Sequence, residues 1–277
     1  MTSQAASDRL GPADFTFSFN CLGEIPLADR FAAARAAGFE EVGLSVRWMR
    51  EWLVEHELSE LDDLLGEHDL RVGELEAIRV MREEPDPLED TAALLAERTR
   101  PLRLQSIGPY DGTVEAGAVR AGRVADRFAE WGVEVVLEPL PFTNMQRPAD
   151  AARIIDEAHR DNLSMCLDVW HLYRMGLPLA HLDGLWPVIS TLQLNDGTLV
   201  AEQPDDLRED CLLHRRIPGE GEFDLVGLLR ARNEHRPDST FSIEVINTEL
   251  KSQDPGLSAR QIAHGIERVV AASLAQE

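Results

Sequence analysis

The sequence predicts a single-domain α/β protein, a (β/α)8 TIM barrel in which helices surround a closed parallel sheet. Eight short β-rich runs alternate with helical patterns along the 277 residues, and strict alternation is typical of parallel strands joined by crossover helices. Barrels of about 250 residues routinely form one domain. Residues 20–24, after the first run, lack a dinucleotide-binding glycine fingerprint, which disfavours the alternative of an open doubly wound sheet.

The expected strands are short and mostly apolar. They cover residues 15–20, 41–46, 70–78, 102–107, 133–137, 164–167, 189–194 and 240–246. The fifth is rich in β-branched residues, as in a parallel strand that is buried on both faces.

Helical patterns separate these strands. They cover residues 27–37, 87–100, 114–131, 148–162, 179–186, 224–234 and 258–274, with a longer amphipathic stretch at 48–68. Gly38 and Gly132 follow two of these patterns as C-terminal stop signals. Pro148 lies at the start of another, where proline is favoured. Residues 196–222 are polar and contain several prolines and glycines, so we expect a long loop there.

We expect residues 1–14 to form a flexible N-terminal segment and residues 15–277 to form the catalytic barrel. Residues 1–14 are polar and lack the apolar core of a signal peptide. The three cysteines, Cys21, Cys166 and Cys211, are widely spaced, which suits a reducing compartment better than a disulfide framework. These features predict a cytoplasmic protein.

The net charge of the chain disfavours some classes of binding partner. The formal net charge is −23, from 50 acidic and 27 basic residues, and such a surface repels nucleic acid and anionic membranes. No apolar run is long enough to span a bilayer. We therefore expect a small-molecule substrate, and the sequence leaves open a homo-oligomer.

Polar residues end four consecutive expected strands. Glu138 ends the fifth, Asp168 ends the sixth, and Gln193 and Glu244 lie in the seventh and eighth. The C-terminal ends of barrel strands carry the active site, so we expect these side chains to converge. Carboxylates brought together raise one another's pKa, and a divalent cation removes that repulsion. Four oxygen donors favour Mn²⁺ or Mg²⁺ over Zn²⁺, with Co²⁺ as a substitute.

Each of these residues also has an ordinary structural interpretation. A carboxylate at a strand end often caps a helix, and Gln193 could satisfy buried main-chain groups. Asp196 is followed by Gly197 and is typical of a turn, so we leave it outside the ligand set.

At these residues the sequence resembles the xylose isomerase-like TIM barrel superfamily, in its sugar phosphate isomerase/epimerase branch. The resemblance runs from about Phe15 to the last helix. The family's strand-five glutamate, Asp-x-x-His motif and closing glutamate match Glu138, Asp168 with His171, and Glu244. The resemblance implies that the three carboxylates bind one metal ion and that His171 touches the substrate.

Two further motifs refine the resemblance. Residues 215–222 are similar to the family's Arg-x-x-Pro-Gly-x-Gly motif, which implies a substrate contact from Arg216. Most members have histidine on strand seven, where this chain has Gln193. A glutamine ligand, with an asparagine shortly after the last glutamate as at Asn247, is similar to the pattern of bacterial 3-dehydroshikimate dehydratases.

The functional prediction is a divalent-metal-dependent isomerase or epimerase of a small polyhydroxy carbonyl compound. Glu138 and Glu244 would move the proton next to the carbonyl, through a metal-stabilised enediolate. His171 would shuttle a proton or bind the substrate. Arg216, and Arg79 after the third strand, are candidates for binding substrate groups, with a structural role as the alternative. A dehydratase (lyase) and a non-catalytic barrel or partner subunit are the alternative functions.

Overall fold

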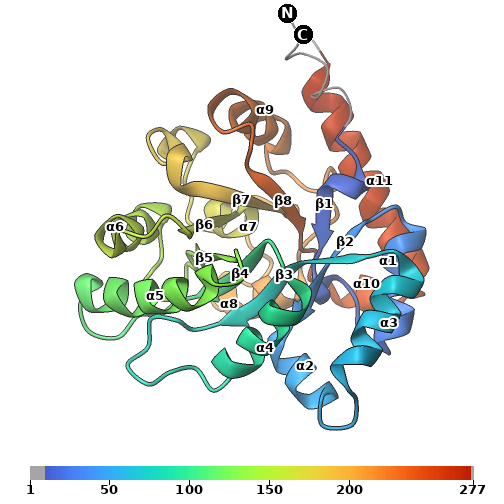
Figure 1. Ribbon diagram of the computed structural model, residues 1–277. Coiled ribbons are helices and arrows are strands. Elements are labelled where there is room, and N and C mark those ends of the chain that lie inside the picture. The colour runs from blue at the N-terminus through green and yellow to red at the C-terminus, as the bar shows by residue number, and fades with distance from the viewer. Residues whose placement is uncertain (1–9, 276–277) are drawn as a thin grey trace, which may run out of the picture.

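The computed structural model describes residues 10–275, which form a closed barrel of eight parallel strands (Figure 1). The strands follow one another in chain order around the barrel, and the last pairs with the first. They are β1 (Phe15–Phe17), β2 (Glu41–Ser45), β3 (Arg71–Ile78), β4 (Arg103–Ile107), β5 (Glu134–Glu138), β6 (Leu163–Asp168), β7 (Ile189–Leu194) and β8 (Thr240–Ile243). The predicted fold class is confirmed.

Helices surround the barrel in Figure 1. They are α1 (Leu27–Ala36), α2 (Val46–Trp52), α3 (Leu58–His68), α4 (Glu89–Thr99), α5 (Val114–Ala129), α6 (Pro148–Ala158), α7 (Val169–Arg174), α8 (Leu207–Leu213), α9 (Leu225–His235), α10 (Thr248–Ser252) and α11 (Pro255–Leu274). Short 3-10 helices are η1 (Pro12–Asp14), η2 (Phe19–Cys21), η3 (Leu179–Leu182) and η4 (Trp186–Val188). Among the described residues, no helix is long and apolar enough to cross a membrane.

Several predicted boundaries differ from the structure. The stretch 48–68 contains two helices, α2 and α3, rather than one. The helix predicted for 148–162 ends at Ala158, because His159 adopts a left-handed conformation with φ of 51°. The segment 179–186 forms two 3-10 turns instead of an α-helix, and the crossover from β6 begins with α7. The long loop predicted for 196–222 contains α8.

The predicted N-terminal segment lies only partly within the described residues. Residues 1–9 fall outside them, so the predicted flexibility stays a prediction. Pro12–Asp14 forms η1 directly before β1, and Leu10 packs against the hydrophobic core. The three cysteines are buried and free.

The inside of the barrel is polar, whereas the hydrophobic core lies between barrel and helices. Arg103 of β4 donates to Glu74 Oε2 of β3 at 3.0 Å and to Thr16 Oγ1 of β1 at 2.9 Å, so these side chains meet inside the barrel. Because successive strand residues point to opposite faces, the fully buried neighbours Leu75 and Leu104 face the helices.

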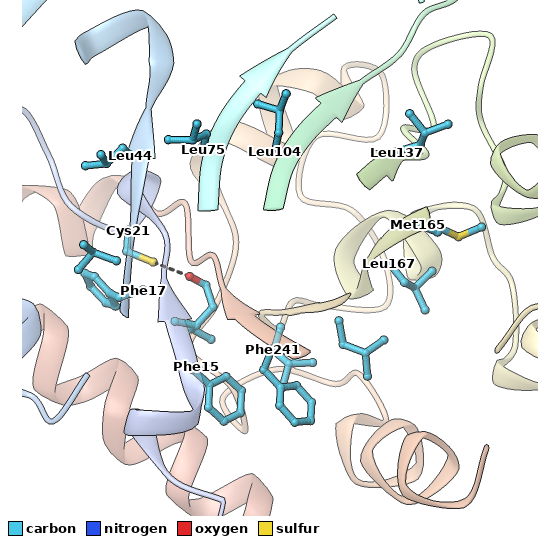
Figure 2. Close-up of a cluster of buried hydrophobic side chains, with 14 of the residues drawn as sticks. Phe15, Phe17, Cys21, Leu44, Leu75, Leu104, Leu137, Met165, Leu167 and Phe241 are labelled. Carbon is cyan, nitrogen blue, oxygen red and sulfur yellow. Dashed lines mark hydrogen bonds between the residues drawn. The ribbon is translucent and has the colours of Figure 1, made fainter. Parts of the chain in front are cut away.

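Figure 2 shows a cluster of buried hydrophobic side chains from strands around the barrel, which includes the contacts between β1 and β8, where the barrel closes. The rings of Phe15 and Phe241 stack with centroids 4.7 Å apart. Cys21 Sγ lies 3.2 Å from the main-chain oxygen of Ile243. These contacts fix the end of β8, one residue before Glu244.

Candidate active site

The four predicted strand-end residues lie at the carboxyl-terminal ends of neighbouring strands. Glu138 and Asp168 are the last residues of β5 and β6, and Gln193 pairs with Asp168 in the register of β6 and β7. Glu244 directly follows β8, and its N–H donates to Leu194 O at 3.0 Å. All four side chains are buried. The geometry therefore places them at one mouth of the barrel.

Glu138, Asp168 and His171 form a tight group. Their ligand atoms all lie within 4.8 Å of one another. His171 Nε2 is 3.0 Å from Glu138 Oε1 and 4.0 Å from Asp168 Oδ2. Asp168 ends β6 and also caps α7, since its Oδ1 accepts from Trp170 N at 2.7 Å. The helix therefore begins without a loop, and its first turn brings His171 back over Asp168.

A buried arginine, Arg215, joins two of the carboxylates. Its Nη1 lies 2.6 Å from Asp168 Oδ2 and 2.8 Å from Glu244 Oε2. Isolated antiparallel bridges join Arg216 to Asp196 and His214 to Asn247 on either side of it. The side chain of Arg215 is buried at the barrel mouth, whereas that of Arg216 is 40% exposed and pairs with Glu202.

Glu244 is held from its other side by the segment after β1. Asn20 Nδ2 lies 2.8 Å from Glu244 Oε1 and 2.8 Å from Glu76 Oε2. Ser18 Oγ also donates to Glu76 Oε2 at 3.0 Å. Glu76 of β3 is thus a further buried carboxylate at this mouth, and η2 fixes the donors that reach it.

Glutamine side chains connect the remaining positions. Gln105 Nε2 donates to Glu138 Oε2 at 2.8 Å and to Gln193 Oε1 at 3.3 Å. Gln193 Nε2 and His171 Nδ1 are buried without a hydrogen-bond partner. Asn195 donates to Asp168 Oδ1 at 3.0 Å. Both carboxylates of the tight group therefore have fixed orientations.

The carboxylates differ in their affinity for protons. Burial raises the pKa of Glu138, although contact with His171 partly opposes this. Burial would also raise the pKa of Asp168, but the Arg215 guanidinium, His171 and the Asn195 amide outweigh it and hold that pKa below its ordinary value. Burial, with Glu74 and Glu244 nearby, raises the pKa of Glu76 well above its usual range. Divergent pKa values within one site are typical of acid–base centres.

A small cavity of about 160 Å³ opens at this end of the barrel. It is lined by Asn20, Ser45, Glu76, Ala77, Gln105, Ile107, Glu138 and Glu244. Two of the predicted functional residues, Glu138 and Glu244, therefore face the same space from β5 and from the end of β8.

The donor set fits a divalent cation. Two carboxylates and an imidazole are within range of a common ion, and two nearby buried nitrogens have no partner. Glu244 is not part of this group: its carboxylate is engaged by Arg215 and Asn20. The structure thus brings His171 to Glu138 and Asp168, while the four-ligand shell with Gln193 and Glu244 stays a prediction.

Two predicted substrate-binding arginines lie apart from this group. Arg216 Nη2 pairs with Glu202 Oε1 at 3.0 Å, and its side chain is 40% exposed. The main-chain N–H of Arg79 donates to Asp86 Oδ2. Neither has a recorded hydrogen bond or ion pair with Glu138, Asp168 or Glu244 among the described residues.

Sequence reasoning missed the site roles of Arg215, Gln105, Asn20 and Glu76. Arg215 stands three residues before Pro218, the spacing of the Arg-x-x-Pro motif, and that spacing would have selected it over Arg216. Gln105 and Glu76 lie inside strands, so a search of strand ends passed over them. The signal that could have identified them is the alternation of side chains along a strand. Gln105 and Glu76 follow Arg103 and Glu74 by two residues, so they point to the same inner face of the barrel.

Comparisons with known proteins identify the family and relatives of the same fold. A family model described as "Xylose isomerase-like TIM barrel" matches residues 31–269. A curated 2-oxo-tetronate isomerase of Haemophilus influenzae is 25% identical over 197 residues, which cover 61% of this chain and 72% of that protein.

Two solved structures share the fold at low sequence identity. The IolI protein with a bound zinc atom has a TM-score of 0.81 at 17% identity, covering 95% of this chain and 100% of that one. The probable 3-DHS dehydratase AsbF of Bacillus anthracis has a TM-score of 0.70 at 17% identity, covering 90% and 97% of the two chains.

Proposed function

Because this chain belongs to the xylose isomerase-like TIM barrel family, we propose that it is a divalent-metal-dependent isomerase or epimerase of a small polyhydroxy carbonyl compound. The observation that carries the proposal is that Glu138 and Glu244 line one cavity, beside a group of ligand atoms suited to a cation. Similarity to a 2-oxo-tetronate isomerase supports the isomerase class.

The proposed cofactor is Mn²⁺ or Mg²⁺, held by Glu138, Asp168 and His171 with Gln193 beside them. Carboxylate oxygens suit both ions, whereas an imidazole ligand suits softer metals better than Mg²⁺, so Mn²⁺ is the first choice. When bound, a divalent cation would act as a Lewis acid that stabilises negative charge on the substrate oxygen.

Glu138 is the proposed proton acceptor. Burial raises its pKa, and a carboxylate that holds a proton more tightly is a stronger base for a carbon-bound proton. His171 Nε2 and Gln105 Nε2 fix its two oxygens, so the side chain keeps one orientation toward the cavity.

Glu244 is the proposed partner on the opposite side. Arg215 pairs with its Oε2 and Asn20 donates to its Oε1. Return of the proton to the opposite face of the same carbon gives an epimer, and return to the neighbouring carbon gives an aldose–ketose isomer. Two carboxylates on strands three apart meet the need for groups on both sides.

Two alternative functions remain to be distinguished from the proposed one by experiment. A dehydratase of the 3-dehydroshikimate type shares the first proton abstraction, and Gln193 favours it. Asn247, which counted toward the dehydratase pattern, caps α10 and donates to Arg215 O at 2.9 Å, so its position has a structural explanation. A non-catalytic barrel would lack any turnover.

The test is a screen of keto-sugars and of 3-dehydroshikimate with Mn²⁺ in deuterated water, followed by NMR. We expect at least one keto-sugar to exchange the proton next to its carbonyl and to form an isomer or epimer. Loss of water from 3-dehydroshikimate without keto-sugar turnover would favour the dehydratase. Absence of exchange and turnover for every compound in the metal-loaded protein would contradict the enzymatic proposal.

A further inference from the structure

Lys251 is the only lysine of the chain and is half-buried. It lies in α10, the short helix that follows Glu244 and the end of β8. Among residues 10–275, its ammonium group forms no hydrogen bond or ion pair, although it interacts electrostatically with Glu244. The chain carries 50 acidic residues, so a half-buried ammonium group without a carboxylate in contact needs an explanation.

The surroundings of Lys251 hold little negative charge. The groups that interact with it electrostatically are Cys21, Glu244, Arg30 and Arg215. Burial raises the pKa of the Cys21 thiol, which is therefore uncharged at neutral pH. Glu244 is the one carboxylate of this group, and its two oxygens already contact Arg215 Nη1 and Asn20 Nδ2, each at 2.8 Å. Three cations of the group therefore face a single carboxylate.

Arg30 is a second cation without a carboxylate in contact among the described residues. Its side chain is 2% exposed, and its two terminal nitrogens donate to the main-chain oxygens of Phe19 and Gly23 at 2.6 and 2.7 Å. Burial lowers its pKa to about 10, so it stays charged at neutral pH. A Cβ atom on Gly23 would lie 2.7 Å from the main-chain oxygen of Lys251. Gly23 therefore contacts both residues, at the edge of the mouth between β1 and β8.

The acidic groups elsewhere in the site do not cancel this positive charge. Burial raises the pKa of Glu76 well above its usual range, which favours the neutral form. Asp168 is compensated by Arg215 at 2.6 Å, and Glu138 lies 3.0 Å from His171. A divalent cation bound by the tight group would add further positive charge. A ligand with one anionic group would therefore be attracted to this mouth.

We propose that Lys251 is a specificity-determining residue that binds a carboxylate or phosphate group of the substrate at the edge of the mouth between β1 and β8. The inference rests on the proposed function and narrows its substrates to polyhydroxy carbonyl compounds that carry an anionic group. The carbonyl end would lie toward Glu138, and the anionic end toward Lys251. Arg30 adds to the positive potential without touching the ligand, because its side chain is buried.

The physical basis is a cation that has lost part of its hydration and has no partner in the folded chain. Burial lowers the pKa of the Lys251 ammonium from an ordinary 10.5, and the nearby Glu244 opposes this fall, so the group keeps its proton at neutral pH. In such surroundings an ion pair is stronger than in water, because the effective dielectric constant is lower. A bound anion would also raise the pKa of the amine, since it favours the charged form.

The first experiment compares three four-carbon probes, which are D-erythronate, D-erythritol 4-phosphate and erythritol. None has an aldehyde or ketone, so binding is measured without turnover. Calorimetry at pH 7 with Mn²⁺ should show at least one anion binding about tenfold or more tightly than erythritol. The two anions distinguish a carboxylate site from a phosphate site. If neither anion binds more tightly than erythritol, the inference is wrong.

Variants test whether Lys251 causes the preference. Lys251→Gln should reduce it about tenfold, while the tight group and its metal ion are preserved. Lys251→Arg keeps the charge and should keep most of the preference. Arg268→Gln is the control, because it removes one positive charge from an exposed pair with Glu220 and should leave the preference unchanged. The assignment fails if Lys251→Gln keeps the preference, or if Lys251→Arg or Arg268→Gln loses as much of it.

Chemical labelling provides a test in the wild-type protein, should Lys251→Gln not fold. Because Lys251 is the only lysine, an acylating reagent modifies this side chain and the terminal amine alone, and peptide mass spectrometry distinguishes the two. The anion that binds should slow the acylation of Lys251 and leave that of the terminal amine unchanged. Equal protection by erythritol, or no protection by either anion, would refute the contact.

Binding and turnover separate this inference from the proposed function. If an anion binds through Lys251 but no keto compound is turned over, the anion site stands and the proposed reaction loses support. If keto-sugars are turned over and Lys251→Gln has the same kcat/KM for neutral and anionic substrates as the wild type, the proposed reaction stands and the anion site is refuted.

Discussion

Arg215 Nη1 lies 2.6 Å from Asp168 Oδ2, and both side chains are almost completely buried. This contact links the end of β6 to the segment that precedes α9, far away in the sequence. Burial alone would lower the pKa of Arg215, but Asp168, Cys211 and Glu244 raise it well above its ordinary value, so the arginine keeps its charge. Asp168 is therefore an ionised partner at the centre of the site.

Removing Arg215 should destabilise the protein strongly. Arg215→Ala leaves Asp168 buried without its partner, and breaking a buried pair costs about 3–5 kcal/mol in the free energy of unfolding. Urea unfolding followed by circular dichroism measures this loss. The matched control is Arg216→Ala, whose side chain is 40% exposed and pairs with Glu202, and which should cost less than about 1 kcal/mol. Equal losses in the two variants would contradict the buried pair.

Metal retention should depend on the tight group. Asp168→Asn and His171→Ala should each lower the Mn²⁺ bound per chain after dialysis, because each removes an atom of the group. Elemental analysis of the dialysed protein measures the ratio. Glu244→Gln should retain more metal than His171→Ala if the ion is held as the structure arranges these atoms. The reverse order would favour the predicted four-oxygen shell instead. EDTA should abolish activity, and Mn²⁺ or Mg²⁺ should restore it.

Glu138→Gln and Glu244→Gln should each lose most activity while the protein stays folded. General acid–base groups contribute typically about 10²–10⁴-fold to rate, and glutamine preserves the size of the side chain and one oxygen. The two variants should differ in exchange, because one step removes the proton and the other returns it. One variant should still exchange the substrate hydrogen for deuterium from the solvent without forming product, which NMR detects. Near wild-type turnover in both variants would transfer the role of base to His171.

The protein should lose stability in alkali between about pH 9 and 11. Burial raises the pKa of the Cys211 thiol from 9.0 to about 11, and burial also raises the pKa of Cys21 and Cys166. For a thiol with a raised pKa, the unfolded chain loses its proton first as pH rises, so the free energy of unfolding falls through this window.

Urea unfolding at a series of pH values measures this slope, and Cys211→Ala should reduce it. The same burial predicts slow reaction of all three thiols with a thiol reagent at pH 8, since the thiolate is the reactive form. Complete reaction should follow in denaturant. Rapid labelling of any of these cysteines in the folded protein would show that its surroundings open in solution.

The fold could be predicted because its signals are local. Apolar strand runs, glycines that end helices and prolines that begin them depend on neighbouring residues alone. Eight strand–helix repeats in a chain of this length are compatible with few architectures. Boundaries were less certain where tertiary contacts decide them. Helix α6 ends at Ala158 and β8 ends at Ile243, although the sequence pattern continues beyond both.

Part of the candidate site was equally accessible from the sequence. Glu138 and Asp168 end apolar runs, and a barrel places all strand ends at one mouth. His171 follows Asp168 by one helical turn, so its position over that carboxylate depends on helix geometry. Arg216 was chosen instead of Arg215 because the sequence does not show which of two adjacent arginines points into the barrel. The bridges to Asp196 and Asn247 on either side of Arg215 decide this in the folded protein.

By itself, the sequence determined the barrel, its open end and the carboxylates there, because these follow from periodicity and from the order of strands. The tertiary structure alone decided which charges meet. Glu76, Asn20 and Glu244 lie on segments separated by up to 224 residues, between Asn20 and Glu244, and only barrel closure between β1 and β8 brings them together. Contacts across such separations depend on register and packing, which no short stretch of sequence encodes.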